Sequence, residues 1–177
     1  MSVNRETKEN QIQDLKGRFD QSKTFYLLDY VNIPVGKSSE LRRQLRENDC
    51  SLKVVKNRLA LRALLEMDLK PKLIDDQKLA IWFAFWGEVK SRPTYRKICD
   101  EYDRYYDSVV EKLCAGIIDE GGYTSITAAA AAEALTCMTN GLWLSCLISP
   151  KDFDRDIGWN AIMSYLANVF PRHYETA

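Results

Sequence analysis

The chain has 177 residues, enough for one domain or two small ones, and its 46% hydrophobic and 28% charged residues exclude global disorder. The formal net charge is zero but unevenly distributed, since residues 1–70 contain 14 lysines and arginines against 10 acids and residues 71–177 contain 11 against 15. A single histidine, His173, and five cysteines without a CxxC pair argue against a histidine-based catalytic site, a zinc site and a disulfide framework. We therefore expect a non-enzymatic protein without catalytic residues, metal or cofactor.

The first third of the chain alternates between helical and strand patterns. Ile12, Leu15 and Phe19 recur at helical spacing and predict an amphipathic helix over residues 4–19. Further along, the composition predicts a strand over residues 24–30, a helix over 38–48 capped by Ser38 or Ser39, a strand over 51–56 and a helix capped by Asn57. This order predicts two parallel strands joined by a right-handed crossover. Two strands rarely suffice, because an independently stable sheet needs three or more.

The rest of the chain has helical patterns only. Helices are predicted over residues 77–91, 94–119 and 124–149 and from Asp152 or Asp154 to Val169, with breaks at Pro93, Gly121-Gly122 and Pro150. The hydrophobic run of residues 79–86, LAIWFAFW, could be a strand, but its flanks favour a helix. The predicted fold class is α+β overall, with an α/β segment of two parallel strands and three helices over residues 1–66 and an all-helical domain over residues 67–177.

Two further features concern location. The polar start MSVNRETKENQ predicts no secretory signal. The most apolar window, residues 126–148, is interrupted by Glu133 and Asn140, which favours a buried helix over a membrane span. We therefore expect a cytoplasmic protein with no membrane partner.

Basic side chains are concentrated between residues 37 and 62, a density that suits phosphate groups. In this region the strings ELRRQLRE and KVVKNRLALRAL, together with NRETKENQIQDLK and TFYLLDY, follow the order of elements of a known family. Residues 3–66 resemble the N-terminal domain of the tenth protein of the large ribosomal subunit, which anchors the ribosomal stalk. That domain binds ribosomal RNA, so the resemblance implies an RNA-binding face formed by Arg42, Arg43, Arg46, Lys53, Lys56, Asn57, Arg58 and Arg62. Composition alone would equally suit a solvated basic surface.

The second part resembles another family through LAIWFAFWGEVKSRPTYRKICDEYDRYYDSVV, NGLWL and SYLANVFPRHY. Residues 64–174 are similar to the C-terminal domain of tetracycline-repressor-type regulators, especially the choline-responsive repressors of betaine operons. Such domains are helical, dimerise through their last two long helices and enclose a small-molecule pocket. The resemblance implies a pocket lined by Trp82, Trp86, Tyr102, Tyr106 and Trp143. Aromatic faces attract a quaternary ammonium by about 0.5 to 2 kcal/mol each, so a choline-like cation is the predicted ligand; a plain aromatic core is the alternative.

The two resemblances meet within residues 60–72, inside one predicted helix. Natural fusions favour flexible boundaries, so a recombined, engineered or computationally generated chain is one hypothesis. The helix-turn-helix with which such regulators bind DNA is replaced by the ribosomal-type segment. The leading interpretation is a homodimeric sensor domain without its DNA-binding part, carrying a basic RNA-binding-type segment. The alternatives are a protein-interaction module that neutralises a partner, like an antitoxin or inhibitor, and a ribosomal RNA-binding protein.

Overall fold

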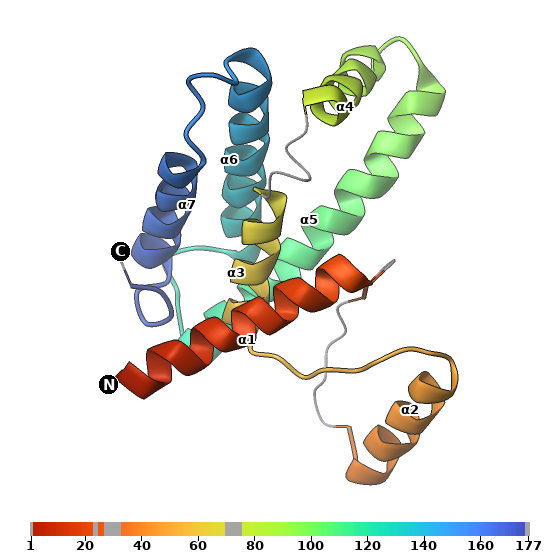
Figure 1. Cartoon of the computed structure of the whole chain (residues 1–177), viewed down its shortest axis with the longest axis vertical. Coiled ribbons are helices and arrows are strands. Elements are labelled where there is room, and N and C mark those ends of the chain that lie inside the picture. Colours follow the sequence, from red (N-terminus) through yellow and green to blue (C-terminus); the bar gives the residue numbers. More distant parts are fainter. Residues whose placement is uncertain (1, 23–24, 27–32, 70–75, 176–177) are drawn as a thin grey trace.

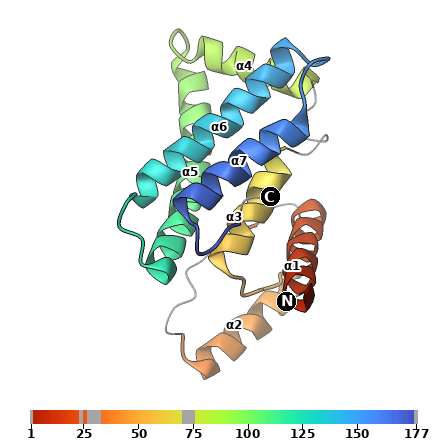
Figure 2. The same ribbon diagram turned by 90° about the vertical axis from the view of Figure 1, so that its left-hand side faces the viewer.

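The computed structural model describes residues 2–22, 25–26, 33–69 and 76–175, and within these ranges it contains seven helices and no strand. The helices are α1 (Ser2–Gln21), α2 (Val35–Glu47), α3 (Asn57–Asp68), α4 (Asp76–Glu88), α5 (Pro93–Gly121), α6 (Ala128–Ile148) and α7 (Arg155–Val169). Helix α3 packs on α5, α5 on α4 and α6, and α6 on α7, while α1 crosses α3 (Figure 1). Both views place α2 and α4 at opposite ends of the molecule (Figure 2).

Local sequence signals account for the ends of the later helices. Pro93 stands in the first turn of α5, where its missing N–H costs nothing, and Gly122 ends the same helix in the left-handed conformation with φ 62°. The Oγ1 of Thr127 accepts a hydrogen bond from the Ala130 amide at the start of α6. Asp154 accepts from two amides at the start of α7. The prediction of an almost wholly helical second part, including a helix at residues 79–86, is confirmed.

The predicted pair of parallel strands is wrong. Residues 51–56 form a connection between α2 and α3 without strand pairing, and Val54 is exposed. Phe25 and Tyr26 are neither helix nor strand, and the other residues of the predicted first strand lie outside the described residues. The physical reason is that a β-prone segment becomes a strand only when a neighbour supplies its backbone partners, and the sequence supplied no third segment to build a sheet.

Two predicted helix caps are also wrong. Helix α2 begins at Val35, three residues before Ser38, because the fixed φ of Pro34 already suits a helix start. Helix α3 is preceded by Lys56, and Asn57 is its first residue and makes no cap. Neither helix start has a side-chain cap.

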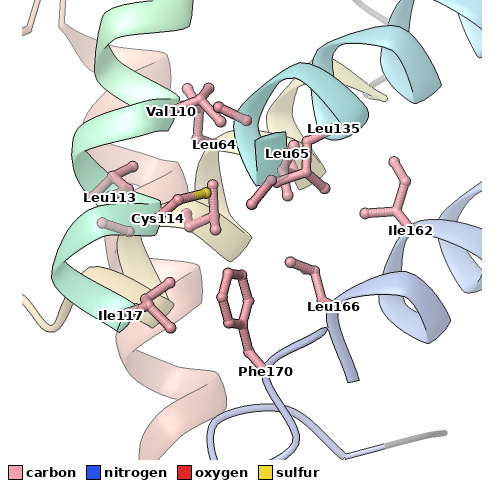
Figure 3. Packing of buried hydrophobic residues seen from close by; sticks show 14 of the residues in the cluster. Leu64, Leu65, Val110, Leu113, Cys114, Ile117, Leu135, Ile162, Leu166 and Phe170 are labelled. Carbon is pink, nitrogen blue, oxygen red and sulfur yellow. The ribbon is translucent and has the colours of Figure 1, made fainter. Parts of the chain in front are cut away.

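Helix α3 is central to the packing because it buries two faces. Its Ala60, Leu61, Leu64 and Leu65 join the main core, formed with α5, α6 and α7 (Figure 3). In this core Val110, Cys114 and Ile117 of α5 converge on Leu135 of α6 and on Ile162, Leu166 and Phe170 of the C-terminal region. On its other face, Leu59 and Ala63 contact Ile12 and Leu15 of α1. Each fully buried Leu, Ile or Phe side chain contributes about 1.5 to 3 kcal/mol, so α3 ties α1 firmly to the helical body.

The chain after α7 returns to the start of α3. The hydroxyl of Tyr174 donates to the Arg58 carbonyl at 2.8 Å, and Nη1 of Arg172 donates to the Gly121 carbonyl at 2.6 Å. The Tyr123 hydroxyl lies 3.0 Å from Nδ1 of His173. His173, the only histidine, therefore helps to join α5 to the C-terminal segment.

In the described ranges no helix is both long and apolar enough to cross a membrane. The same ranges contain no group of three or more His, Cys, Asp and Glu side chains placed to hold a metal ion.

Candidate ligand-binding site

A cavity of about 570 Å³ lies between the end of α3 and helices α4, α5 and α6. Its volume falls in the range of small-molecule sites. The lining residues are Asp68, Lys78, Leu79, Trp82, Trp86, Asp103, Tyr106, Asp107, Glu133, Thr136, Cys137, Thr139, Asn140 and Trp143. Aromatic and acidic side chains are prominent in this set.

The structure brings four of the five predicted aromatic residues to this cavity. Trp82 and Trp86, one turn apart on α4, have ring centroids 6.0 Å from each other. Tyr106 of α5 and Trp143 of α6 line other walls. The side chain of the fifth residue, Tyr102, lies outside the described part of the chain.

Asp68 is the most deeply buried acid of the cavity. It is the last residue of α3, with 6% of its surface exposed, and its carboxylate accepts a hydrogen bond from the Tyr106 hydroxyl. Burial raises the pKa of Asp68 to about 7, and the hydrogen bond from Tyr106 opposes this rise. The Trp143 indole nitrogen donates to the Asp68 backbone carbonyl at 2.9 Å, so a hydrogen bond also connects Asp68 to α6.

Three more acids stand around the same space. Burial, with Asp107 and Asp100 nearby, raises the pKa of Asp103. Asp107 accepts a hydrogen bond from Oγ1 of Thr136 at 3.1 Å, and Glu133 lies on the exposed side. Lys78 is the basic residue of the lining, so carboxyl groups outnumber ammonium groups four to one. This arrangement favours a cationic ligand.

Sequence reasoning missed these acids. Asp103 and Asp107 are spaced i, i+4 and flank Tyr106, a pattern that could have placed them on the ligand side of α5. No local pattern could have found Asp68, because its partner Tyr106 is 38 residues away.

Comparisons with known proteins point to two families. A family model described as BetI-type transcriptional repressor, C-terminal, matches residues 57–171, and one described as ribosomal protein L10 matches residues 3–102. The large ribosomal subunit protein uL10 of Chloroherpeton thalassium is 32% identical over 122 residues, which is 68% of this chain and 69% of that protein. The uL10 protein of Chlorobium limicola is 30% identical over 113 residues, 64% of each chain.

The chain belongs to both families.

A crystal structure of a protein from Pseudomonas aeruginosa PAO1, described as a transcriptional regulator, has a similar fold. Its TM-score is 0.62 at 24% sequence identity, and the match covers 79% of this chain and 67% of the other. Both resemblances inferred from the sequence are therefore confirmed.

The L10 and BetI-type matches overlap over residues 57–102, which comprise α3, α4 and the start of α5. The boundary predicted between residues 66 and 67 falls inside α3, a continuous helix. The helical body therefore takes in the later part of the L10 match. Of the seven described helices, only α1 and α2 lie outside the BetI-type match.

The predicted RNA-binding residues of the L10-type segment are distributed over two helices and the connection between them. Arg42, Arg43 and Arg46 lie on α2, Lys53 and Lys56 on the connection, and Asn57, Arg58 and Arg62 on α3. Five of the eight have partners within the chain. These are Arg42 with the Leu52 carbonyl, Arg43 with Glu40 and Glu47, Lys53 with Asp14, Arg58 with the His173 carbonyl, and Arg62 with Glu9 and Glu66.

Asn57 differs from the other seven because its side chain points into the body. A Cβ placed on Gly116 of α5 would lie 2.1 Å from its Nδ2 atom, so this amide occupies the space that the glycine leaves open. The eight residues therefore lie on three segments of the chain, with the side chain of Asn57 directed towards α5.

Proposed function

We propose that the BetI-type part binds a small organic cation with a quaternary ammonium group, such as choline, in the cavity between α3, α4, α5 and α6. The observation that carries this proposal is the placement of Trp82, Trp86, Tyr106 and Trp143 around one space that also holds four acids. Each desolvated cation–π contact contributes about 0.5 to 2 kcal/mol. A quaternary ammonium has no N–H to donate, so aromatic faces and carboxylates are its natural partners.

A purely structural role explains this site less well. Protein cores are filled to crystal-like density, whereas this space is large enough for a ligand. The buried Nε1 of Trp86 has no hydrogen-bond partner among the described residues.

Calorimetry with choline and with its uncharged carbon analogue tests the proposal. Choline should bind and the analogue should not, because only the cation gains from the aromatic faces and the acids. Replacing Trp86 with Ala should lower the affinity for choline at least tenfold, since a tenfold change corresponds to about 1.4 kcal/mol. The control is Trp159→Ala, which removes a tryptophan that does not line this cavity. Equal or absent heats for the two compounds would refute cation recognition.

The same part also has the surface expected for pairing with a second copy. On α6 and α7 the side chains of Leu144, Ile148 and Ile157 are 41%, 69% and 68% exposed, which favours an interface along these helices. Replacing Leu144 with Arg should give monomers in sedimentation velocity. The control, Ile81→Arg on the exposed side of α4, should leave the dimer intact. A dimer that survives Leu144→Arg would place the interface elsewhere.

RNA binding by the L10-type segment is a second candidate function. It is favoured by α2, which has no buried residue and carries Arg42, Arg43 and Arg46. Removing these three arginines should weaken binding to ribosomal RNA and flatten its salt dependence, by roughly one unit of slope for each phosphate that is no longer neutralised. The control removes Lys90, Arg92 and Arg96, an exposed basic group at the turn into α5. Equal affinity of both triple variants would mean that α2 is only a solvated surface.

A further inference from the structure

One carboxyl group of the cavity, that of Asp68, lies where an unpaired negative charge is unfavourable for two separate reasons. Asp68 is almost completely buried. It is also the last residue of α3, and the C-terminal end of a helix carries partial negative charge, with no basic residue in the last turn of α3 to offset it. An empty cavity therefore favours the protonated, neutral form of this side chain.

The charged and titratable groups that face Asp68 come from three helices. Helix α4 contributes Lys78, α5 contributes Asp103, Tyr106 and Asp107, and α6 contributes Glu133 and Cys137. Lys78 is exposed. The Tyr106 hydroxyl contacts Asp68 directly, because it donates to the carboxylate and so stabilises the charged form.

We propose that Asp68 is a proton-linked counter-ion, protonated in the empty cavity and ionised when a quaternary ammonium binds. On binding, the O–H bond of the carboxyl group breaks, the electron pair stays on the carboxylate and the proton leaves to solvent. The ligand keeps its own charge, so the cavity exchanges one proton for one organic cation. This inference rests on the proposed function and adds control of that site by pH.

The geometry explains why Asp68 and not another acid has this role. Asp103 and Asp107 are only partly buried, and Glu133 is exposed. Asp68 alone combines deep burial with direct contact to one of the aromatic walls, through Tyr106. A cation held against Tyr106 therefore lies close to this carboxyl group, where it favours the ionised form.

The inference predicts that affinity rises with pH. The pKa of Asp68 is about 7 in the empty protein, so the fraction already ionised falls about tenfold for each pH unit below that value. Choline affinity should therefore drop about tenfold between pH 8 and pH 6 and level off above pH 8. About one proton should be released for each choline bound at pH 6, and almost none at pH 8.

Calorimetry with choline in phosphate and in HEPES, buffers with different heats of ionisation, measures the released protons. Asp68→Asn should abolish both the proton release and the pH dependence. Choline binding with the same heat in both buffers at pH 6 would overturn the inference and leave cation binding standing. Absence of binding at every pH would instead refute the proposed function and the inference with it.

A second variant gives a test that does not depend on the folding of Asp68→Asn. Tyr106→Phe keeps the aromatic ring but removes the hydrogen bond that favours the carboxylate, so the midpoint of the pH dependence should move upward. Tyr165→Phe, which changes a buried hydroxyl away from the cavity, should not move it. Carbon-13 NMR of the aspartate carboxyl groups with and without choline should show Asp68 titrating near pH 7 only in the empty protein. An unmoved midpoint in Tyr106→Phe, or an Asp68 signal already ionised at pH 6 without choline, would overturn the inference.

Discussion

Helices α2 and α3 are almost equal in length, 13 and 12 residues, and both lie within the ribosomal-type match, yet their surroundings are opposite. Helix α3 buries seven residues, six of them apolar residues shared between α1 and the main core. Helix α2 buries none and carries ion pairs from Arg43 to Glu40 and Glu47 along its own surface. Such exposed pairs contribute only about 0.3 to 0.5 kcal/mol each.

The contrast shows what allows a segment to be shared between two families. The leucines and alanines of α3 form generic apolar surfaces, which pack wherever other helices offer apolar side chains of suitable volume. Leu41 and Leu45 of α2 lie on an apolar stripe as well, but no described helix covers them extensively. Tertiary partners, and not the sequence of the helix itself, decide which of the two belongs to the core.

The largest expected effect comes from equivalent substitutions in the two helices. Leu65→Ala in α3 removes a fully buried side chain and should lower the free energy of unfolding by about 2 to 5 kcal/mol. Leu45→Ala in α2 should cost less than about 1 kcal/mol, because little buried apolar surface is removed. Denaturant titration of both variants measures the difference. Similar effects of the two substitutions would mean that α2 is packed against the body in solution.

The sequence predicted the helical body well because its signals are local. Pro93, Gly122 and Asp154 set helix ends through their own backbone or side chain, within a turn of where they stand. The strand prediction failed for the opposite reason. The pattern of residues 51–56 suits a strand, but pairing depends on segments distant in the chain.

The candidate site was predictable only in part. The family resemblance pointed to Trp82, Trp86, Tyr106 and Trp143, which do surround one cavity. It did not point to Asp68, whose burial and hydrogen bond exist only after α3, α5 and α6 have packed together. The basic residues were predicted as a single face, and in the structure they lie on α2, on the connection and on α3.

The pKa values of acids in the two helices are shifted in opposite directions, so their contributions to stability should depend on pH in opposite ways. In α3 the pKa of Asp68 is raised from 3.8 to about 7 by burial, so the folded state binds this proton more tightly than the unfolded state. Its contribution to stability is therefore greatest at low pH and declines as pH rises from about 4 to 7, by at most about 1.4 kcal/mol per pH unit. In α2 hydrogen bonds from Arg43 and Gln44 lower the pKa of Glu40, a fully exposed group.

Unfolding measured at pH 5 and at pH 7 separates these contributions. Relative to Asp68→Asn, the unmodified protein should lose about 1 to 3 kcal/mol of stability over this interval. The matched variant Glu40→Gln should follow the unmodified protein, because α2 contributes little to global stability. Parallel curves for Asp68→Asn and the unmodified protein would show that Asp68 is solvated in the folded state, and would also weaken its assignment as a proton-linked counter-ion.

The smallest expected effect on stability comes from comparing a helix cap in the body, Asp154, with an exposed ion pair of α2, that of Arg43. Asp154 accepts hydrogen bonds from the amides of Asp156 and Ile157 at 2.8 and 3.2 Å, so Asp154→Ala should cost about 0.5 to 2 kcal/mol in global unfolding. Arg43→Ala should cost less than about 0.5 kcal/mol, because its ion pairs are exposed. Amide hydrogen exchange would then show faster exchange confined to α2 in the second variant, since a helix without tertiary partners opens by itself. Faster exchange throughout the body after Arg43→Ala would mean instead that α2 unfolds together with α3, and that the two helices differ less than their burial indicates.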